Sequence, residues 1–539
     1  MKFRKFISAA FAALMSASLI ACGSSTAEPA TPADAEAPAE TEAAAPAAEA
    51  ATASADSINI ELTTAPVGLH PLKTNDAPST YVNGQIFETL YRRTNDGTAY
   101  DPQLAAELPE FSEDGMTATI RLREGVKFHD GTDFTADAVA YMIDSLKDEN
   151  YGSQRPSIVE SIDSYEIVDP LTIKLNLLYS DGVLTAKLAH TNGCIVNPEL
   201  DKSQDLLVDA TGAGTGPYKY VSSTAGSTYS LEANEEYWGG APEVKNVKFD
   251  VVADEATAVA RLQTGEADLY PTIQADSFST AAAITGYTAV SETSSAIYFL
   301  SLRSRASQAK NPNMENPEFR KAIIEAVDMP SYVTSVVGNQ GTYVKSIVGP
   351  TLVGYTPEMD NANVAYNAED AKAIIDANGW AGQEITMLVS TREWHQTVAA
   401  YVQDALSKVG ITVNVVSEEW ATYLADAKED GTYDFCILSW SNVTGDGQQM
   451  LEPNFSTKNG VRTKYDNADF DAAVDASARS TVLEERQAAM LEAVNLIQGD
   501  YIVAPLYSQN TAFVYNSAKF SDVVFDKSGQ FTIKDFKVN

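Results

Sequence analysis

Cysteine and histidine are scarce in this sequence of 539 residues. It contains three cysteines, Cys22, Cys194 and Cys436, and four histidines. No two cysteines are spaced as CxxC, which excludes a locally assembled zinc knuckle or redox dithiol. Cys194 and Cys436 both lie in apolar runs, so we expect them to be buried free thiols rather than a disulfide or a nucleophile. No cofactor is expected.

The sequence also lacks the common signatures of hydrolases. It has no GxSxG nucleophile elbow and no HExxH zinc motif. His70, His129, His190 and His395 are far apart in sequence, and we expect His129, beside a predicted turn at 130–131, to pack there rather than bind a metal. A glycosidase that uses a pair of carboxylates is not excluded, because any chain with 74 acidic residues contains possible pairs.

Basic residues are few relative to acidic ones. Lys and Arg number 37 against 74 Asp and Glu, giving a formal net charge of −37. Such a surface argues against nucleic-acid binding, which needs clustered cations facing phosphates. Hydrophobic content of 44% is typical of a soluble globular protein. The length predicts two or more domains.

Long apolar runs are missing after the N-terminus. Residues 1–22 combine a basic start with a short apolar region, which is typical of a secretory signal. Leu19-Ile20-Ala21-Cys22 resembles the bacterial lipobox, which implies removal of residues 1–21 and lipidation of Cys22; an ordinary signal peptide is the alternative. The remainder of 22–55 is rich in Ala, Pro and Glu and is expected to be a disordered tether. We therefore expect the protein on the extracytoplasmic face of a bacterial membrane.

The stretch from Glu418 to Asp446 is the most informative part of the remaining chain. Trp420, Tyr423 and Ala427 recur at helical spacing, and the apolar run 433–440 predicts a buried strand. The sequence then turns polar and glycine-containing. A buried strand that opens into such a loop is a common ligand position in α/β proteins. The loop is therefore predicted to line a cleft, unless its Trp440 is only a core residue.

Other segments predict an alternation of strands and helices. Strands are expected at 57–64 and 116–122. Helices are expected at 79–92, after Thr135 as N-cap, at 254–262 with Gly265 near the C-cap, and at 320–327. This order predicts an α/β fold.

A family resemblance rests on several motifs in a fixed order. The segment EDGMTATIRLREGVKFHDGTDFTADAV at 113–139 resembles the extracytoplasmic solute-binding proteins of peptide, nickel and related ABC importers, with Ala138 at the family's Asp position. Further similar segments cover 214–220, 234–269, 319–329, 365–380, 418–440 and 464–507. The resemblance thus extends over essentially all of 56–539.

The resemblance implies a two-lobed, periplasmic-binding-protein-like α/β fold with a hinge, of the large cluster C type. The chain would leave lobe I near 292–296 and return near 504–509. Lobe I would then comprise 56–292 and 509–539, with an extra subdomain at about 91–209, and lobe II would comprise 297–503.

The implied function is that of a lipid-anchored, monomeric substrate-binding subunit of an ABC importer. It would capture a peptide-like solute between its lobes and deliver it to the membrane permease. A nickel chelate, an oligosaccharide or another small solute on the same fold is the alternative ligand. A secreted hydrolase, or an adhesin or sensor that keeps the fold without transport, are the alternative functions.

The ligand itself is not fixed by the sequence. Peptide-binding relatives carry an Asp three residues after the strand Trp and some carry an Arg three residues before it, whereas this chain has Val443 and Ile437. Asp446 is predicted either to replace that anionic anchor or to stabilise the turn. The aromatic candidates are predicted to line the pocket or the core, and the arginines to meet a carboxylate or to form exposed salt bridges. The candidate ligand-binding residues are Tyr81, Arg392, Trp394, His395, Trp420, Trp440, Ser441, Asn442, Val443, Thr444, Asp446 and Arg462.

Overall fold

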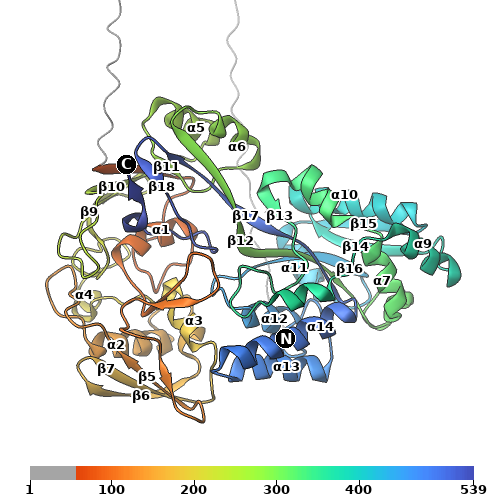
Figure 1. The fold of residues 1–539 in the computed structure, drawn as a ribbon, viewed down its shortest axis with the longest axis horizontal. Coiled ribbons are helices and arrows are strands. Elements are labelled where there is room, and N and C mark those ends of the chain that lie inside the picture. Colours follow the sequence, from red (N-terminus) through yellow and green to blue (C-terminus); the bar gives the residue numbers. More distant parts are fainter. Residues whose placement is uncertain (1–55) are drawn as a thin grey trace, which may run out of the picture. The chain divides into compact units, whose positions relative to one another are not determined.

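A computed structural model describes residues 56–539, so the predictions for Cys22, the signal peptide 1–21 and the tether 22–55 fall outside the described residues. The main feature is an eleven-stranded sheet in the order β15-β14-β16-β12-β17-β11-β1-β10-β9-β8, with β13 paired to β17. Two long antiparallel strands, β12 (Tyr287–Leu302) and β17 (Val503–Asn516), lie in the middle of this order. They join the two halves of the sheet (Figure 1), which we call the lobe I half and the lobe II half after the predicted lobes that contain them.

The lobe I half of the sheet is built on β1 (Ser57–Leu62), as the sequence predicted. Its alternate residues Ile58, Ile60 and Leu62 are buried, which is the period-2 signature of a strand. β1 pairs in parallel with β10 and β11, and β9 and β8 continue the sheet in antiparallel fashion. The bounds are Asn246–Val251 for β10, Leu269–Tyr270 for β11, Thr228–Ala233 for β9 and Tyr218–Thr224 for β8.

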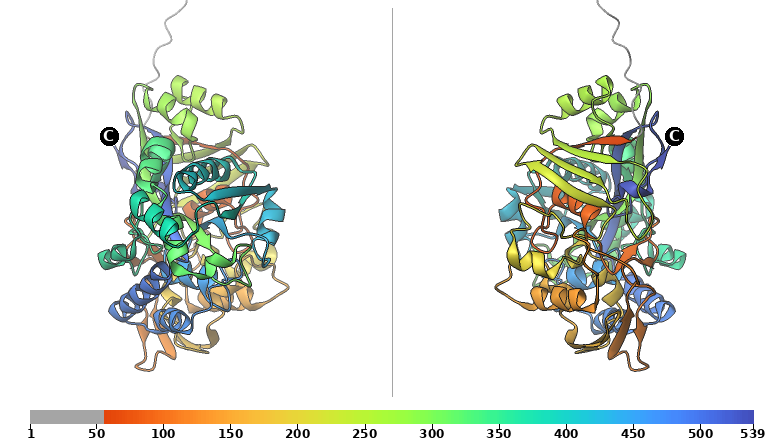
Figure 2. Two further views of the ribbon diagram at one scale, coloured as in Figure 1. Left: turned by 90° about the vertical axis from the view of Figure 1, so that its right-hand side faces the viewer. Right: turned by 90° about the vertical axis from the view of Figure 1, so that its left-hand side faces the viewer.

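The lobe II half contains the predicted buried strand, β16 (Phe435–Ser441). It pairs in parallel with β14 (Glu384–Ser390), which in turn pairs with β15 (Thr412–Glu418), and antiparallel with β12. Phe435 and Ile437 pack into one apolar cluster, and Cys436 and Leu438 pack into the cluster on the opposite face. Because both faces are covered there, the residues from Phe435 to Leu438 are all apolar. Figures 1 and 2 show helices packed around these strands.

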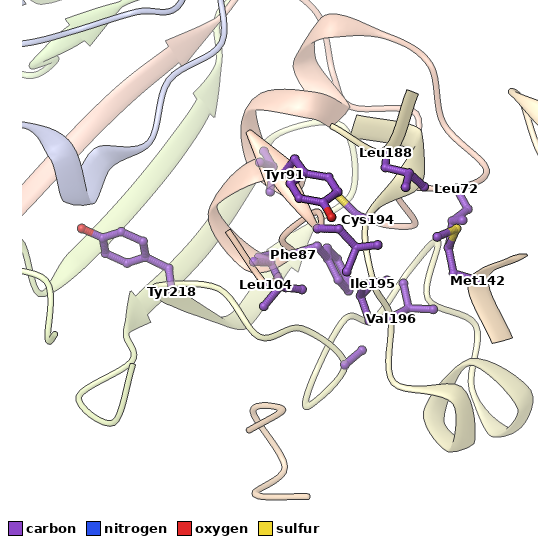
Figure 3. Close-up of a cluster of buried hydrophobic side chains, with 14 of the residues drawn as sticks. Leu72, Phe87, Tyr91, Leu104, Met142, Leu188, Cys194, Ile195, Val196 and Tyr218 are labelled. Carbon is purple, nitrogen blue, oxygen red and sulfur yellow. The ribbon is translucent and has the colours of Figure 1, made fainter. Parts of the chain in front are cut away.

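A second, four-stranded sheet lies inside the segment predicted as an extra subdomain. Its order is β4-β5-β7-β6, and α2 (Ala136–Lys147) packs beside it. Its residues Ile120 and Leu175 belong to the same core cluster as Ile60 and Phe249 of the lobe I sheet. Figure 3 shows part of this cluster, including Met142 of α2. The bounds are Glu110–Phe111 for β4, Thr117–Arg121 for β5, Thr172–Leu177 for β7 and Ile162–Asp169 for β6.

The other elements connect and cover these sheets. The helices are α1 Ala77–Ile86, α3 Leu184–Leu188, α4 Pro198–Ser203, α5 Glu255–Thr264, α6 Ala275–Ala282, α7 Pro317–Glu325, α8 Met329–Tyr332, α9 Ala368–Ala377, α10 Glu393–Lys408, α11 Trp420–Asp426, α12 Gln448–Phe455, α13 Ala468–Arg479 and α14 Leu483–Gly499. The remaining strands are β2 Tyr91–Arg93, β3 Tyr100–Pro102, β13 Gly341–Thr342, β18 Phe520–Asp522 and β19 Lys537–Val538. Among the helices of residues 56–539, none has the length and apolarity that crossing a bilayer requires.

The predicted helix at 79–92 is wrong in its second half. α1 ends at Ile86, and Tyr91–Arg93 form strand β2 instead. The reason is tertiary: the carbonyl of Ile86 accepts a hydrogen bond from the amide of Gly216 at 2.9 Å. A side chain at Gly216 would meet backbone atoms of Gln85 and Ile86 at 2.6–2.8 Å, so only glycine allows this approach.

Several smaller predictions are confirmed. α5 begins after Asp254, whose carboxylate accepts from the Thr257 amide, and ends at Gly265 with φ +76°. Cys194 and Cys436 are both buried and free. Thr135 occupies the N-cap of α2, but its side chain accepts no capping hydrogen bond from the first turn.

His129 packs in its turn, as predicted. Its Nε2 donates to the carbonyl oxygen of Gly216 at 2.9 Å. Burial lowers the pKa of His129 to about 4, so the imidazole is neutral near pH 7.

Candidate functional site

Strand β16 and the loop after it line three neighbouring cavities. Every residue from Ile437 to Thr444 borders at least one of them. The first cavity ends at Trp440 and the second begins at Ser441. The second and third cavities share Val443 and Ser528. The stretch predicted to line a cleft therefore borders three separate hollows, one after another along the chain.

The first cavity, which we call the aromatic pocket, has a volume of about 250 Å³ and is lined by Trp420, Tyr423 and Trp440 among others. Trp420 stacks on Tyr423 with ring centroids 5.5 Å apart. The guanidinium of Arg392 lies 3.5 Å from the centroid of the Trp420 ring, a cation–π geometry. Arg462 also lines this pocket, and its Nε is buried without a partner among the described residues. Both predicted arginines thus lie at one aromatic pocket.

His395 lies at the back of the aromatic pocket and is neutral. Its Nδ1 accepts a hydrogen bond from the Ser390 amide at 2.8 Å, which places the ring proton on Nε2. Burial and the charge of Arg392 lower the pKa of His395 to about 3. Trp394 does not line any of the three cavities; it packs edge-on against Tyr298, with centroids 4.4 Å apart, and against His395.

The second cavity, the crossover cavity, has a volume of about 290 Å³ and is lined by Ser441–Val443, by Tyr81 of α1 and by both crossing strands. The pairing of β12 with β17 is irregular between Thr293 and Ile297, beside this cavity. Tyr81 stacks on Phe531 with centroids 5.1 Å apart, and burial raises its pKa to about 12. Since lobe I, lobe II and the strands between them all contribute walls, the shape of this cavity depends on how the lobes are placed.

The loop after β16 is held by its own polar side chains. Asn442 donates to the carbonyl of Asp446 at 2.6 Å and accepts from the amide of Gly445. Asp446 is fully buried, accepts from the Gln448 amide, and forms an ion pair with Arg486 at 2.6 Å. It lines none of the three cavities, so its contacts support the turn-stabilising role and not the role of ligand anchor.

Lobe I and the crossing strands also fix this loop. The hydroxyl of Tyr100 on β3 donates to the carbonyl of Thr444 at 2.9 Å. The hydroxyl of Ser295 on β12 donates to the carbonyl of Asn442 at 3.0 Å. The loop therefore presents Val443, which is exposed, at a meeting point of the two lobes.

The third cavity, the arginine cavity, has a volume of about 130 Å³ and is lined by Arg93, Val443 and Thr444 together with lobe I residues. Sequence reasoning did not select Arg93 or Tyr100. The pair Arg92-Arg93 is unusual in so acidic a chain and was the available signal. No group of three or more His, Cys, Asp or Glu side chains able to hold a metal occurs among residues 56–539.

Comparison with known proteins identifies the family. The model of bacterial extracellular solute-binding proteins, family 5 Middle, matches residues 99–461. Heme-binding protein A of Haemophilus influenzae is 26% identical over 498 residues, covering 85% of each chain. Oligopeptide-binding protein AppA of Bacillus subtilis is 25% identical over 431 residues, covering 75% of this chain and 77% of AppA.

The fold agrees with this assignment. The structure of HbpA2 from Haemophilus parasuis superposes with a TM-score of 0.81 at 22% identity, over 90% of this chain and all of that one. This likeness establishes the two-lobed α/β fold. Proteins of this family bind solutes for transport and are not enzymes. The chain belongs to the bacterial extracellular solute-binding proteins, family 5.

Proposed function

We propose that this protein is the lipid-anchored substrate-binding subunit of an ABC importer and that it captures a peptide-like solute between its lobes. One observation carries the proposal: three small cavities follow one another along a strand and its loop, and two of them have walls from both lobes. An elongated solute with several side groups fits this arrangement.

The edge of β16 is suited to an extended peptide. β14 pairs with β16 only at Phe435 and Cys436. From Ile437 to Ser441, no strand of the described part of the chain pairs with that edge. A peptide main chain can add to such an edge as an extra strand, with its side chains entering pockets on alternate sides. Residues of this same stretch line the aromatic pocket and the crossover cavity.

The sizes of the cavities favour a chain over a single bulky molecule. None of the three exceeds about 290 Å³, whereas compact drug-sized ligands occupy pockets of ~300–1,000 Å³. A peptide spreads its volume over several pockets. The name of the relative AppA, an oligopeptide-binding protein, therefore agrees better with these cavities than that of heme-binding protein A.

Capture would work by closure of the lobes. A solute that contacts both lobes only in the closed state shifts the population toward that state, and the permease then recognises it. We place the lobe boundaries as the sequence predicted, at 56–292 with 509–539 for lobe I and 297–503 for lobe II. The irregular pairing between Thr293 and Ile297 supports a hinge there.

The anchor is proposed on sequence alone, because Cys22 lies outside the described residues. Lipidation there would hold the folded body at the outer face of the membrane. Partition of the intact protein into the detergent phase of a Triton X-114 extraction would support the anchor, and recovery in the aqueous phase would refute it.

Native mass spectrometry of the purified protein tests the proposed function. We expect co-purified short peptides, or binding of peptides from an added mixture without their cleavage. A bound nickel chelate or oligosaccharide would overturn the peptide assignment, and accumulation of product would point to a hydrolase.

A further inference from the structure

Arg93, at the end of β2, is a buried cation that has no partner in the described part of the chain. Its side chain belongs to a residue that is only 8% exposed. None of its three guanidinium nitrogens has a hydrogen-bond partner among residues 56–539, and no carboxylate oxygen of that part of the chain lies within 4.0 Å of them. An unpaired buried charge is strongly unfavourable, so such a group is normally paired with an anion.

The acidic side chains that line the arginine cavity are engaged elsewhere. Glu88 accepts from the side chains of Tyr237, Trp238, Thr215 and Gln103. Asp535 pairs with Arg92 at 3.0 Å. Asp526 accepts from the amides of Ser528 and Gln530 within its own turn. Within residues 56–539, no acidic side chain that lines the cavity pairs with Arg93.

The position of the guanidinium is fixed by the lobe II loop. A side chain at Gly445 would place its Cβ 2.0 Å from Nη1 and 2.3 Å from Cδ of Arg93. Arg93 therefore lies directly against the Gly445 backbone, which has φ +77° and favours glycine for that reason as well. The guanidinium of a lobe I residue is held at the same loop that supplies Val443 and Thr444 to the cavity wall.

We propose that the arginine cavity binds a carboxylate group of the solute and that Arg93 is the residue that pairs with it. This inference rests on the proposed function and names the chemistry of one end of the ligand. Val443 offers no charge to a ligand amine at this position, whereas Arg93 carries a guanidinium, a group that can donate two hydrogen bonds to one carboxylate. A cavity of about 130 Å³ has room for the acidic end of a solute, and the adjoining crossover cavity takes the rest.

One competing partner exists inside the protein. Oδ2 of Asp446 is buried and also lacks a partner among the described residues, while its Oδ1 pairs with Arg486. A small movement of the lobes could join Arg93 to this oxygen and make the pair a latch between lobes. A latch would strengthen binding of all solutes alike, whereas a ligand site discriminates between acids and their uncharged derivatives.

The test is a competition measured by native mass spectrometry. The purified full-length protein is mixed with tripeptides such as Ala-Phe-Ala as the free acid and as the C-terminal amide, and with Ala-Glu-Ala amide. We expect the acids to be retained ~10- to 100-fold better than the neutral amide, the range of a charge-assisted hydrogen bond. If Ala-Glu-Ala amide is retained, the site accepts a side-chain carboxylate. If this peptide is not retained, the site requires the carboxylate of the C-terminus.

Variants separate the site from the latch. Arg93→Gln should bring the ratio of acid to amide close to one, and Arg93→Lys should keep part of the preference. Arg121→Gln, which changes an exposed arginine that is paired with Glu110 and lines none of the three cavities, should keep all of it. Equal retention of the acid and the amide by the wild-type protein would overturn the inference while leaving the proposed function intact. The same conclusion would follow if Arg93→Gln weakened binding of the acid and of the amide by the same factor. Retention of no peptide would overturn both.

Discussion

The ion pair between Asp446 and Arg486 sets the position of the loop after β16, and its removal gives a quantitative prediction. The Nη2–Oδ1 distance is 2.6 Å, and the two side chains are 0% and 6% exposed. Arg486 also donates to the carbonyl of Ser477 at 2.8 Å. Arg486→Met would leave the carboxylate buried without its cation. Breaking a buried pair in this way costs ~3–5 kcal/mol of unfolding free energy.

A matched control isolates the contribution of burial. Arg305 and Asp466 form a pair of nearly the same length, 2.5 Å, but their side chains are 44% and 51% exposed. Arg305→Met should therefore cost less than ~1 kcal/mol. Urea denaturation of the full chain, followed by circular dichroism, measures both losses.

The double variant completes this test. In Asp446→Asn/Arg486→Met both charges are absent, and the asparagine oxygen still accepts from the Gln448 amide. We expect it to recover most of the loss of Arg486→Met, because the penalty comes from the unpaired charge. If Arg486→Met costs no more than Arg305→Met, the loop is not held by this pair and the reasoning fails.

Two further predictions concern lobe contact and pH. Gly182→Ala should weaken solute binding roughly tenfold, because the new Cβ would lie 1.8 Å from the Ser480 carbonyl oxygen where lobe I meets the end of α13. Gly499→Ala, whose new Cβ meets no atom within 4 Å, is the control. Equal affinities of the Gly182→Ala and wild-type proteins in a calorimetric titration would contradict this role. The pKa of His395 is about 3 in the folded protein and ~6.5 in the unfolded chain. As pH falls below ~6.5 the unfolded chain therefore takes up a proton that the folded protein does not. The contribution of neutral His395 to the free energy of unfolding is thus present above pH ~6.5 and is lost as pH falls toward 3. His395→Gln should flatten this part of the pH dependence of urea unfolding, and an unchanged slope between pH 7 and pH 5 would refute it.

Much of the fold could be predicted because its signals are local. The apolar run Phe435–Leu438 in β16 is contiguous in sequence, and such a run is typical of a strand that is buried on both faces. The caps of α5, Asp254 and Gly265, lie next to the helix that they end. The tertiary bond from Gly216 to Ile86 that ends α1 early joins residues 130 positions apart, and no local pattern announces it.

The candidate site also contains residues that local sequence could place and residues that it could not. The residues from Trp440 to Thr444 could be placed at a cavity because the strand, its tryptophan and the polar loop are contiguous in sequence. The burial of Asp446 depends on Arg486, 40 positions later, so sequence left its two roles open. Arg93 comes to the loop from lobe I through the packing of the two lobes. The pair Arg92-Arg93 is the only signal of it in the sequence, and that pair does not show which residues Arg93 will meet.

The tryptophan at the end of β16 gives the most direct test of the central claim, that the solute lies along this strand and its loop. Trp440→Ala removes a wall of the aromatic pocket, while Trp394→Ala removes a neighbouring tryptophan that lines none of the three cavities. Calorimetric titration with a peptide identified by native mass spectrometry should show no detectable binding to Trp440→Ala and near wild-type affinity for Trp394→Ala, with both variants folded by circular dichroism. Wild-type affinity in Trp440→Ala would contradict the account and remove this loop from the site.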